Sequence, residues 1–191
     1  MSGAAAGPDG RLRCPWGLGA PDYLPYHDDE WGKPVHGDTA LFERVSLEAF
    51  QSGLSWITIL RKRPAFREAF AGFDPAQVAA FDDADIERLM ADAGIVRNRA
   101  KVAATIANAH AVLALDGSLD ELLWSFAPRP PRVAPRGLGD VPAVTDESTA
   151  MAKELKRRGF RFVGPTTAYA LMQATGMVND HLASCAFRGA T

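Results

Sequence analysis

Two cysteines and two histidines at opposite ends of the chain form a set of possible metal ligands. Cys14 and His27 lie near the start of the sequence, and His181 and Cys185 lie near its end. His181 and Cys185 are four residues apart, so both project from one face if their segment is helical. Zinc takes two thiolates and two imidazoles in a tetrahedron, which leaves no position open for a substrate. The pattern therefore indicates a structural zinc site that joins the two chain ends.

The same four residues allow a plainer interpretation. The chain has only 2 cysteines and 4 histidines, and a pair at a spacing of four is easily found by chance. A cytosolic protein rarely keeps a disulfide, so the alternative to a zinc site is a pair of buried, inert thiols.

A carboxylate occupies a position next to an apolar helical stripe. Leu41, Val45 and Ala49 recur at helical spacing, and Glu48 falls on or beside their line. A carboxylate that faces a core is costly unless it is paired or functional. Glu48 is therefore a candidate for the acid of a binding pocket, and the alternative is that it points to solvent.

Five aromatic residues in the first third of the chain could complete such a pocket. Four of them lie in a polar stretch punctuated by proline and glycine, which is not typical of a core helix. Aromatic faces bind flat or cationic ligands, although most buried aromatic side chains only fill a core. The five residues are Trp16, Tyr23, Tyr26, Trp31 and Trp56.

A glycine turn between two predicted helices is a candidate phosphate site. Gly94 lies in this turn, and Arg97 and Lys101 follow it at the start of the next helix. Backbone N–H groups beside a helix N-terminus bind phosphate whatever the nucleic-acid sequence. Helix–glycine–helix joints are also common as purely structural turns, and the adjacent cations shift the interpretation toward nucleic acid.

The elements that must position these residues are predicted to be almost all helical. Capping residues, apolar periodicity and glycine or proline stops define their bounds. A loop is predicted over 127–142, where five prolines exclude a helix or a central strand. Residues 1–10 are expected to form a loose tail, and no strand is predicted. The predicted helices are 38–49, 56–63, 64–70, 77–81, 83–90, 100–115, 118–126, 145–159, 165–175 and 180–187.

Length and composition suit one globular domain. The chain has 191 residues, 47% of them hydrophobic, and a formal net charge of −2. We expect a flexible head over 1–11 and a single compact unit over 12–191, with a central helical hairpin region at about 38–126. No apolar run approaches the roughly 18 residues that span a bilayer, and the start lacks a signal-peptide core, so a cytoplasmic location is expected. Because the chain is not basic overall, nucleic acid could bind only where positive charge gathers on one face.

Short motifs follow one another in a fixed order from about Cys14 to the C-terminus. They are YHDDEWG at 26–32, LE at 47–48, QSGLSW at 51–56, DAGI at 92–95, KRRGF at 156–160, FVG at 162–164, and NDH at 179–181 followed by Cys185. In these motifs the chain resembles the 3-methyladenine DNA glycosylase I family, which belongs to the helix-hairpin-helix glycosylase superfamily.

The resemblance implies an all-α fold with a helix-hairpin-helix element and a structural zinc ion at Cys14, His27, His181 and Cys185. It implies that Glu48 is the pocket acid, that Tyr26 and Trp56 are the pocket aromatics, and that Trp16, Tyr23 and Trp31 line or support them. Gly94, Arg97 and Lys101 are then expected to contact phosphates. The sequence departs from other members at Ala49 and Phe50, and we expect Phe50 to lie beside the pocket and alter its shape.

The implied activity is removal of a damaged base from double-stranded alkylated DNA. The family flips the nucleotide out of the duplex and hydrolyses the bond between base and deoxyribose, chiefly for 3-methyladenine, with 3-methylguanine as a further substrate to consider. It lacks the catalytic aspartate of the wider superfamily. No lysine nucleophile is indicated, so a monofunctional enzyme without lyase activity is expected, acting as a monomer.

Two other functions fit parts of the pattern. A non-catalytic, zinc-stabilised DNA-binding module would keep the hairpin and the metal ligands but would need no aromatic pocket with an acid. A glycosylase with another range of bases, such as 3-methylguanine or bulkier adducts, would keep every feature named above.

Overall fold

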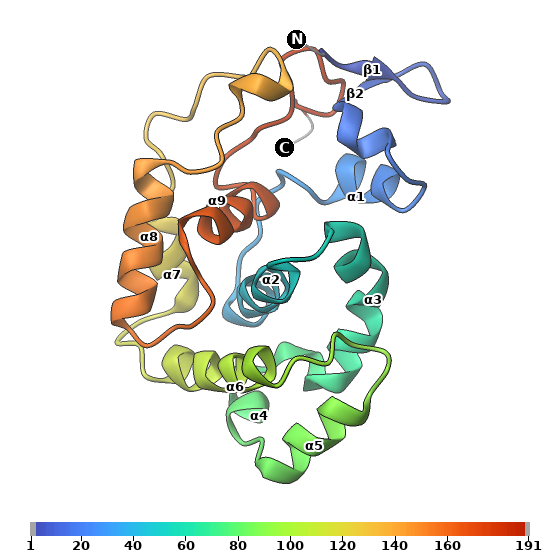
Figure 1. Cartoon of the computed structure of the whole chain (residues 1–191). Helices are drawn as coiled ribbons and strands as arrows, with labels where there is room; N and C mark the ends of the chain where they lie inside the picture. The colour runs from blue at the N-terminus through green and yellow to red at the C-terminus, as the bar shows by residue number, and fades with distance from the viewer. Residues whose placement is uncertain (1–2, 190–191) are drawn as a thin grey trace.

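Helices dominate the computed structural model, which describes residues 3–189 (Figure 1). The predicted helical class is therefore confirmed. Three short 3-10 segments, Pro15–Leu18, Ala71–Phe73 and Leu138–Asp140, lie between the longer elements. The strands are β1 (Ala5–Ala6) and β2 (Leu12–Arg13), and the α-helices are α1 (Tyr23–Asp29), α2 (Asp38–Gln51), α3 (Trp56–Ala69), α4 (Pro75–Ala79), α5 (Asp83–Ala91), α6 (Arg99–Leu113), α7 (Leu119–Trp124), α8 (Asp146–Arg157) and α9 (Pro165–Ala174).

Side-chain caps explain where several helices begin. The Ser118 hydroxyl accepts a hydrogen bond from the Glu121 N–H, and the Glu121 carboxylate accepts one from the Ser118 N–H, which forms a capping box at the start of α7. Thr145 caps α8 in the same reciprocal manner with Ser148. These bonds satisfy N–H groups that a helix start leaves without partners.

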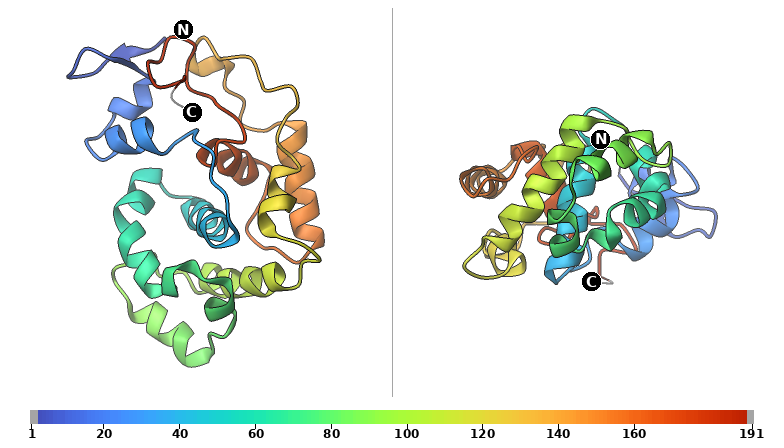
Figure 2. Two further views of the ribbon diagram at one scale, coloured as in Figure 1. Left: turned by 180° about the vertical axis from the view of Figure 1, so that it is seen from behind. Right: turned by 90° about the horizontal axis from the view of Figure 1, so that it is seen from below.

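Helix α2 lies at the centre of the molecule and packs against α3, α6, α7 and α9 (Figures 1 and 2). Its Phe50 is 0% exposed, and the Phe50 ring centroid lies 4.7 Å from that of Phe66. Phe50 therefore belongs to the hydrophobic core and is not part of the pocket lining. The expectation that it would shape the pocket is wrong, because its side of α2 faces α3 and not the cavity.

The two ends of the chain lie close together at one end of the molecule (Figures 1 and 2). Strands β1 and β2 pair antiparallel, with Ala5 opposite Arg13 and Ala6 opposite Leu12. The Ala186 N–H donates to the Leu12 carbonyl at 2.8 Å, which ties the C-terminal segment to β2. The sequence predicted a loose tail here and no strand, whereas residues 3–13 form a short hairpin; Met1 and Ser2 lie outside the described residues.

The structure differs from the predicted elements at three places. The polar stretch around Tyr26 forms the short helix α1, which was not predicted. Pro64 does not open a new helix but lies inside α3, which runs unbroken from Trp56 to Ala69. Residues 180–187 form successive turns and no helix, as the Cys185 N–H donates to the Leu182 carbonyl three residues back. None of the helices described is long and apolar enough to cross a membrane.

Candidate active site and metal cluster

Ion pairs fix α1 against the two helices that carry the candidate pocket residues. The Glu30 carboxylate accepts hydrogen bonds from both terminal nitrogens of Arg63, at 2.6 and 2.7 Å, and from Arg44 of α2 at 3.2 Å. These two arginines lower the pKa of Glu30 against the opposing effect of its burial. At the other end of α1, Arg61 pairs with Asp22 at 2.7 Å. The aromatic residues of α1 are thereby held in a defined position.

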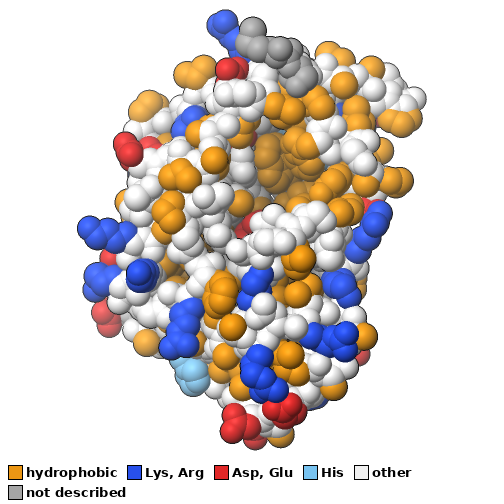
Figure 3. All heavy atoms as spheres, viewed as in Figure 1, with side chains coloured by type: hydrophobic (Ala, Val, Ile, Leu, Met, Phe, Trp, Pro, Cys, Tyr) orange, Lys and Arg blue, Asp and Glu red, His pale blue; other side chains and the backbone are white. Residues whose placement is uncertain are grey.

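A cavity of about 410 Å³ opens between α9 on one side and α1 and α3 on the other, above the end of α2. It is visible in Figure 3 as a hollow lined with hydrophobic side chains. Its volume falls in the range of pockets that hold small organic ligands. The lining residues are Trp16, Tyr23, Tyr26, Trp31, Glu48, Gln51, Trp56, Leu138, Val141, Ala170, Gln173, Ala174 and Asp180.

All five predicted aromatic residues contribute to this lining. The rings of Tyr26 and Trp56 are 5.4 Å apart and tilted by 45°. Trp16 lies edge-on to Tyr23 at 5.7 Å and to Trp31 at 4.9 Å. The Tyr23 hydroxyl accepts a hydrogen bond from the backbone N–H of Ile57, which ties it to the start of α3. One wall of the cavity is therefore a continuous aromatic surface, suited to a flat or cationic ligand.

Glu48 faces the same cavity and is almost completely enclosed. Its side chain is 5% exposed, and no protein group within residues 3–189 hydrogen-bonds to its carboxyl. Burial raises the pKa of Glu48 to about 8, although Arg44, one turn earlier on α2, acts in the opposite direction. The acid therefore gains its charge most readily when a cation or a hydrogen-bond donor enters the cavity.

Several lining residues were not predicted from the sequence. Gln51, Gln173 and Asp180 are polar, while Leu138 and Val141 come from the proline-rich loop. Loop residues leave no periodic signal. Asp180 belongs to the NDH motif at 179–181, where the sequence predicts only the start of a helix. Its presence in the cavity could have been suspected from its place next to His181.

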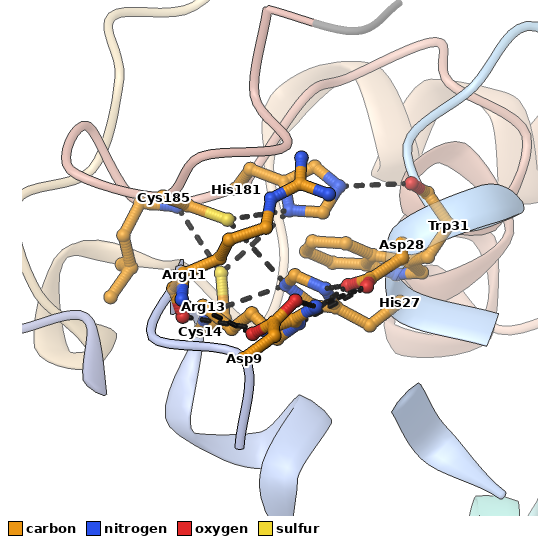
Figure 4. Close-up of polar contacts among 10 residues, drawn as sticks. Asp9, Arg11, Arg13, Cys14, His27, Asp28, Trp31, His181 and Cys185 are labelled. Atoms are coloured by element: carbon orange, nitrogen blue, oxygen red, sulfur yellow. Dashed lines mark hydrogen bonds and ion pairs between the residues drawn. The ribbon is translucent and has the colours of Figure 1, made fainter. Parts of the chain in front are cut away.

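The four predicted metal ligands converge into one buried Cys/His cluster, formed by Cys14, His27, His181 and Cys185 (Figure 4). Their ligand atoms lie within 4.8 Å of one another. The Cys185 Sγ is 3.5 Å from Nδ1 of His181 and 3.7 Å from Nε2 of His27, and the Cys14 Sγ is 3.8 Å from Nδ1 of His181. Tetrahedral zinc with ordinary bond lengths separates sulfur and nitrogen ligands by about 3.6 Å. The donor set and its spacing therefore fit zinc.

Outer hydrogen bonds orient both imidazoles toward the centre of the cluster. The Asp28 carboxylate accepts from Nδ1 of His27 at 2.8 Å, and Arg13 in turn donates to Asp28 at 2.7 and 2.9 Å. The Trp31 carbonyl accepts from Nε2 of His181 at 3.0 Å (Figure 4). Carboxylates and carbonyls in these positions are typical partners of metal-bound histidines. Because Trp31 also lines the cavity, the cluster and the cavity share a wall.

The predicted phosphate-binding turn packs closely on α3. A Cβ at Gly94 would come within 3.0 Å of the Ala65 side chain, so any larger residue would push the turn away from α3. The ammonium of Lys62 donates to the carbonyls of Ala93 and Gly94, at 2.9 and 3.1 Å. Arg97 is exposed at the end of the turn. Figure 3 shows Lys and Arg side chains gathered below and beside the hollow, on the same face of the molecule.

Lys101 differs from the prediction that it would contact phosphate. Its side chain is buried, and its ammonium donates to the carbonyls of Phe50 and Ser52, at 2.8 and 2.6 Å. Both carbonyls lie at the C-terminal end of α2, where a helix leaves its last acceptors without partners. Lys101 therefore fastens the turn between α2 and α3, which carries the exposed Leu54 at the edge of the cavity.

Comparison with known proteins finds consistent relatives over almost the whole chain. Residues 16–189 match the model of a family described as methyladenine glycosylase. The chain is 46% identical over 177 residues to DNA-3-methyladenine glycosylase 1 of Escherichia coli K12, covering 91% of this chain and 95% of the relative. It is 46% identical over 177 residues to DNA-3-methyladenine glycosylase of Haemophilus influenzae, covering 91% and 96%.

Solved structures give the same result. A crystal structure of a 3-methyladenine DNA glycosylase I matches with a TM-score of 0.88 at 46% identity, covering 91% of this chain and 98% of the other. The structure of the Staphylococcus aureus 3-methyladenine DNA glycosylase I, described as the structural basis of 3-methyladenine recognition, matches with a TM-score of 0.87 at 38% identity, covering 92% and 96%.

Proposed function

The chain belongs to the methyladenine glycosylase family, and we propose from this premise that it excises 3-methyladenine from alkylated double-stranded DNA. The relatives are named as enzymes that act on the N-glycosidic bond of this base. The observation that supports the proposal most strongly is the buried Glu48 in a cavity walled by aromatic rings.

Recognition of the base follows from charge. An adenine alkylated at N3 carries a positive charge while it is still bonded to deoxyribose, and aromatic faces favour a cation over a neutral base by roughly 0.5–2 kcal/mol. The ionised Glu48 accepts a charge-assisted hydrogen bond from the amino edge of the base. The attraction between the cationic base and the carboxylate offsets the free-energy cost of burying Glu48 in its charged form, so the damaged base and the acid stabilise each other.

The leaving group explains why strong acid catalysis is dispensable. When the glycosidic bond breaks, its electron pair neutralises the charge of the alkylated base, which leaves as neutral 3-methyladenine. Extrusion from the duplex costs a few kcal/mol and is easier for a damaged base that stacks poorly. No lysine lines the cavity in the described part of the chain, which supports the proposal of a monofunctional enzyme without lyase activity.

The range of bases depends on what Glu48 meets at the edge of the purine. Adenine presents an amino donor at this edge, whereas guanine presents a carbonyl acceptor. The ionised acid repels that carbonyl, but a Glu48 whose pKa is about 8 can also be protonated and donate to it. We therefore propose 3-methyladenine as the main substrate and 3-methylguanine as a slower one.

The DNA is proposed to lie across the face that carries the cavity opening and the cations of Figure 3. The turn at Gly94 and the exposed Arg97 would contact phosphates, as in a helix-hairpin-helix element. Leu54 is 40% exposed on the turn between Gln51 and Trp56, both of which line the cavity. An apolar side chain at this place can fill the gap that a flipped nucleotide leaves in the stack.

We propose that the Cys/His cluster holds a structural zinc ion. A zinc ion there would stabilise the folded state by joining the segments that carry Cys14 and His181, and it would take no part in chemistry because all four positions are filled by protein. One chain supplies the complete cavity, which favours action as a monomer. Because the proposed substrate is DNA, we further propose that the protein acts in the compartment that holds the genome.

The test is release of free base from methylated duplex DNA, resolved by chromatography. We expect 3-methyladenine in the soluble fraction and intact strands with abasic sites in the DNA. Strand cleavage without added alkali would contradict the monofunctional part of the proposal. DNA binding without base release would favour the non-catalytic DNA-binding module.

A further inference from the structure

The cavity contains a second carboxylate that recognition of the base does not use. Asp180 is 3% exposed and lines the cavity, in the segment that follows α9. Glu48 reaches the same cavity from α2, whereas Asp180 comes from the side of α9 together with Gln173, Ala170 and Ala174. A second buried acid is costly to keep unless it is paired or functional.

Two hydrogen bonds fix only one oxygen of Asp180. The Tyr169 hydroxyl and the Gln173 amide both donate to its Oδ2, at 2.5 and 2.9 Å. No protein group within residues 3–189 donates to Oδ1. Although Oδ1 of Asp180 has no hydrogen-bond partner within these residues, protein atoms do not enclose it completely. Oδ1 is therefore the oxygen of Asp180 that remains available to accept a hydrogen bond from a molecule in the cavity that this residue lines.

The two sides of the cavity differ in what they can hold. The aromatic rings and Glu48 form a slot for a flat cationic base. On the other side, the small side chains of Ala170 and Ala174 leave room beside the carboxylate of Asp180. With a base in this slot, the deoxyribose and an attacking water would lie on the side of α9, where Asp180 lines the cavity.

We propose that Asp180 acts on the deoxyribose side of the reaction, where it orients the attacking water and stabilises the positive charge that develops on the sugar. This proposal rests on the proposed function. The bond between the base nitrogen and C1′ breaks, and its electron pair neutralises the base. The water oxygen bonds to C1′, and the water gives up one proton to bulk solvent. Asp180 accepts a hydrogen bond from the water through Oδ1 and is unchanged at the end.

The test compares Asp180→Asn with Glu48→Gln under single-turnover conditions. Asp180→Asn keeps the shape and an oxygen that can accept from Tyr169 and Gln173, but it removes the charge. We expect excision of 3-methyladenine from methylated duplex DNA to slow by about 10- to 100-fold. Binding of free 3-methyladenine, which is neutral, should stay within about twofold of the wild-type value. Glu48→Gln should instead weaken binding of the free base.

Tyr169→Phe is the matched control for a purely structural role. It removes one of the two bonds to Asp180 and keeps the carboxylate. If Asp180 only ties α9 to the C-terminal segment, both variants should lower the melting temperature alike and should excise at the same rate. We expect Tyr169→Phe to excise faster than Asp180→Asn. Equal excision by Asp180→Asn and wild type would overturn the inference, and so would a parallel loss of free-base binding.

A measurement on the unchanged protein keeps the inference testable if Asp180→Asn does not fold. Duplexes carrying a pyrrolidine abasic-site analogue, whose ring nitrogen is protonated, imitate the charged sugar, and tetrahydrofuran duplexes imitate its neutral shape. With 3-methyladenine present, we expect the cationic duplex to bind about 10-fold more tightly. Equal affinities would overturn the inference. Absence of base release by the wild-type protein would overturn the proposed function, which separates the two failures.

Discussion

Replacing Glu48 by glutamine separates the stability of the fold from recognition of the damaged base. The substitution preserves the size of the side chain and removes its charge. The carboxyl lies in the cavity with 5% exposure and no protein hydrogen bond from residues 3–189. A neutral amide costs less to bury than a carboxylate. The variant should therefore fold normally and be at least as stable as the wild-type protein.

The pKa of Glu48 determines the size and the pH dependence of the stability gain expected for the glutamine variant. Burial raises the pKa of Glu48 from its ordinary value of 4.5 to about 8. Because the folded value lies above the unfolded one, the ionised acid opposes folding, and its effect grows as pH rises from 4.5 to about 8. Each pH unit in this window lowers the free energy of unfolding of the wild-type protein by about 1.4 kcal/mol. At pH 7 the glutamine variant should therefore be more stable than the wild-type protein by at most about 3 kcal/mol. Below pH 4.5 the two proteins should be equally stable.

Excision of 3-methyladenine should become slower in the glutamine variant, although the variant is at least as stable as the wild-type protein. Loss of one charge-assisted contact to the base corresponds to roughly 1.5–3 kcal/mol, or about a 10- to 100-fold slower excision of 3-methyladenine. Affinity for undamaged DNA should not change, because phosphate contacts do not involve Glu48. The assays are urea unfolding at pH 5, 7 and 8.5 and single-turnover excision. A stability difference that does not vary with pH would show that Glu48 is not buried as a charged group, and excision at the wild-type rate would show that it does not bind the base.

The metal cluster and the DNA face give three further predictions. Cys185→Ala should lose zinc and melt at a lower temperature, and elemental analysis showing well under one zinc per wild-type chain would contradict the assignment. Asp28→Asn, which weakens the partner of His27, should lower zinc affinity about 10- to 100-fold in a chelator competition, and unchanged affinity would exclude the outer-sphere role. Arg97→Ala should reduce the salt dependence of DNA binding by about one unit, whereas Lys101→Met should not change it. An unchanged salt dependence in Arg97→Ala would place the DNA on another face.

The helices of the interior could be predicted because their apolar period and caps are local properties. Ser118 and Thr145, at the predicted starts of two helices, each form a reciprocal cap with the residue three positions later. Helix α1 was missed because its stability comes from ion pairs made far away in sequence, chiefly those of Glu30 with Arg44 and Arg63.

The four candidate metal ligands come together as the sequence predicts, but one pair does so by a different backbone path. His181 and Cys185 do not share a helix face but meet through turns. The set of four residues could still be predicted, because a metal site depends on which ligand atoms come together and not on the backbone path that brings them there.

Lys101 and Asp180 show where sequence reasoning fails. A lysine after a glycine turn suggests phosphate, yet the burial of Lys101 against the end of α2 depends on packing between helices that no local pattern records. Asp180 enters the cavity through a chain reversal after α9, and a reversal gives no periodic signal. The polar and loop residues of the cavity were missed for the same reason.

Recognition of the adenine edge by Glu48 can be tested by identifying the bases that excess enzyme releases from one methylated duplex DNA. Such DNA contains 3-methyladenine and 7-methylguanine, both of which are cationic, so charge alone does not distinguish them. The carboxylate of Glu48 favours the amino edge of adenine over the carbonyl edge of guanine. We expect rapid release of 3-methyladenine, with 7-methylguanine retained in the DNA. Release of both bases at similar rates, or of neither, would contradict this expectation.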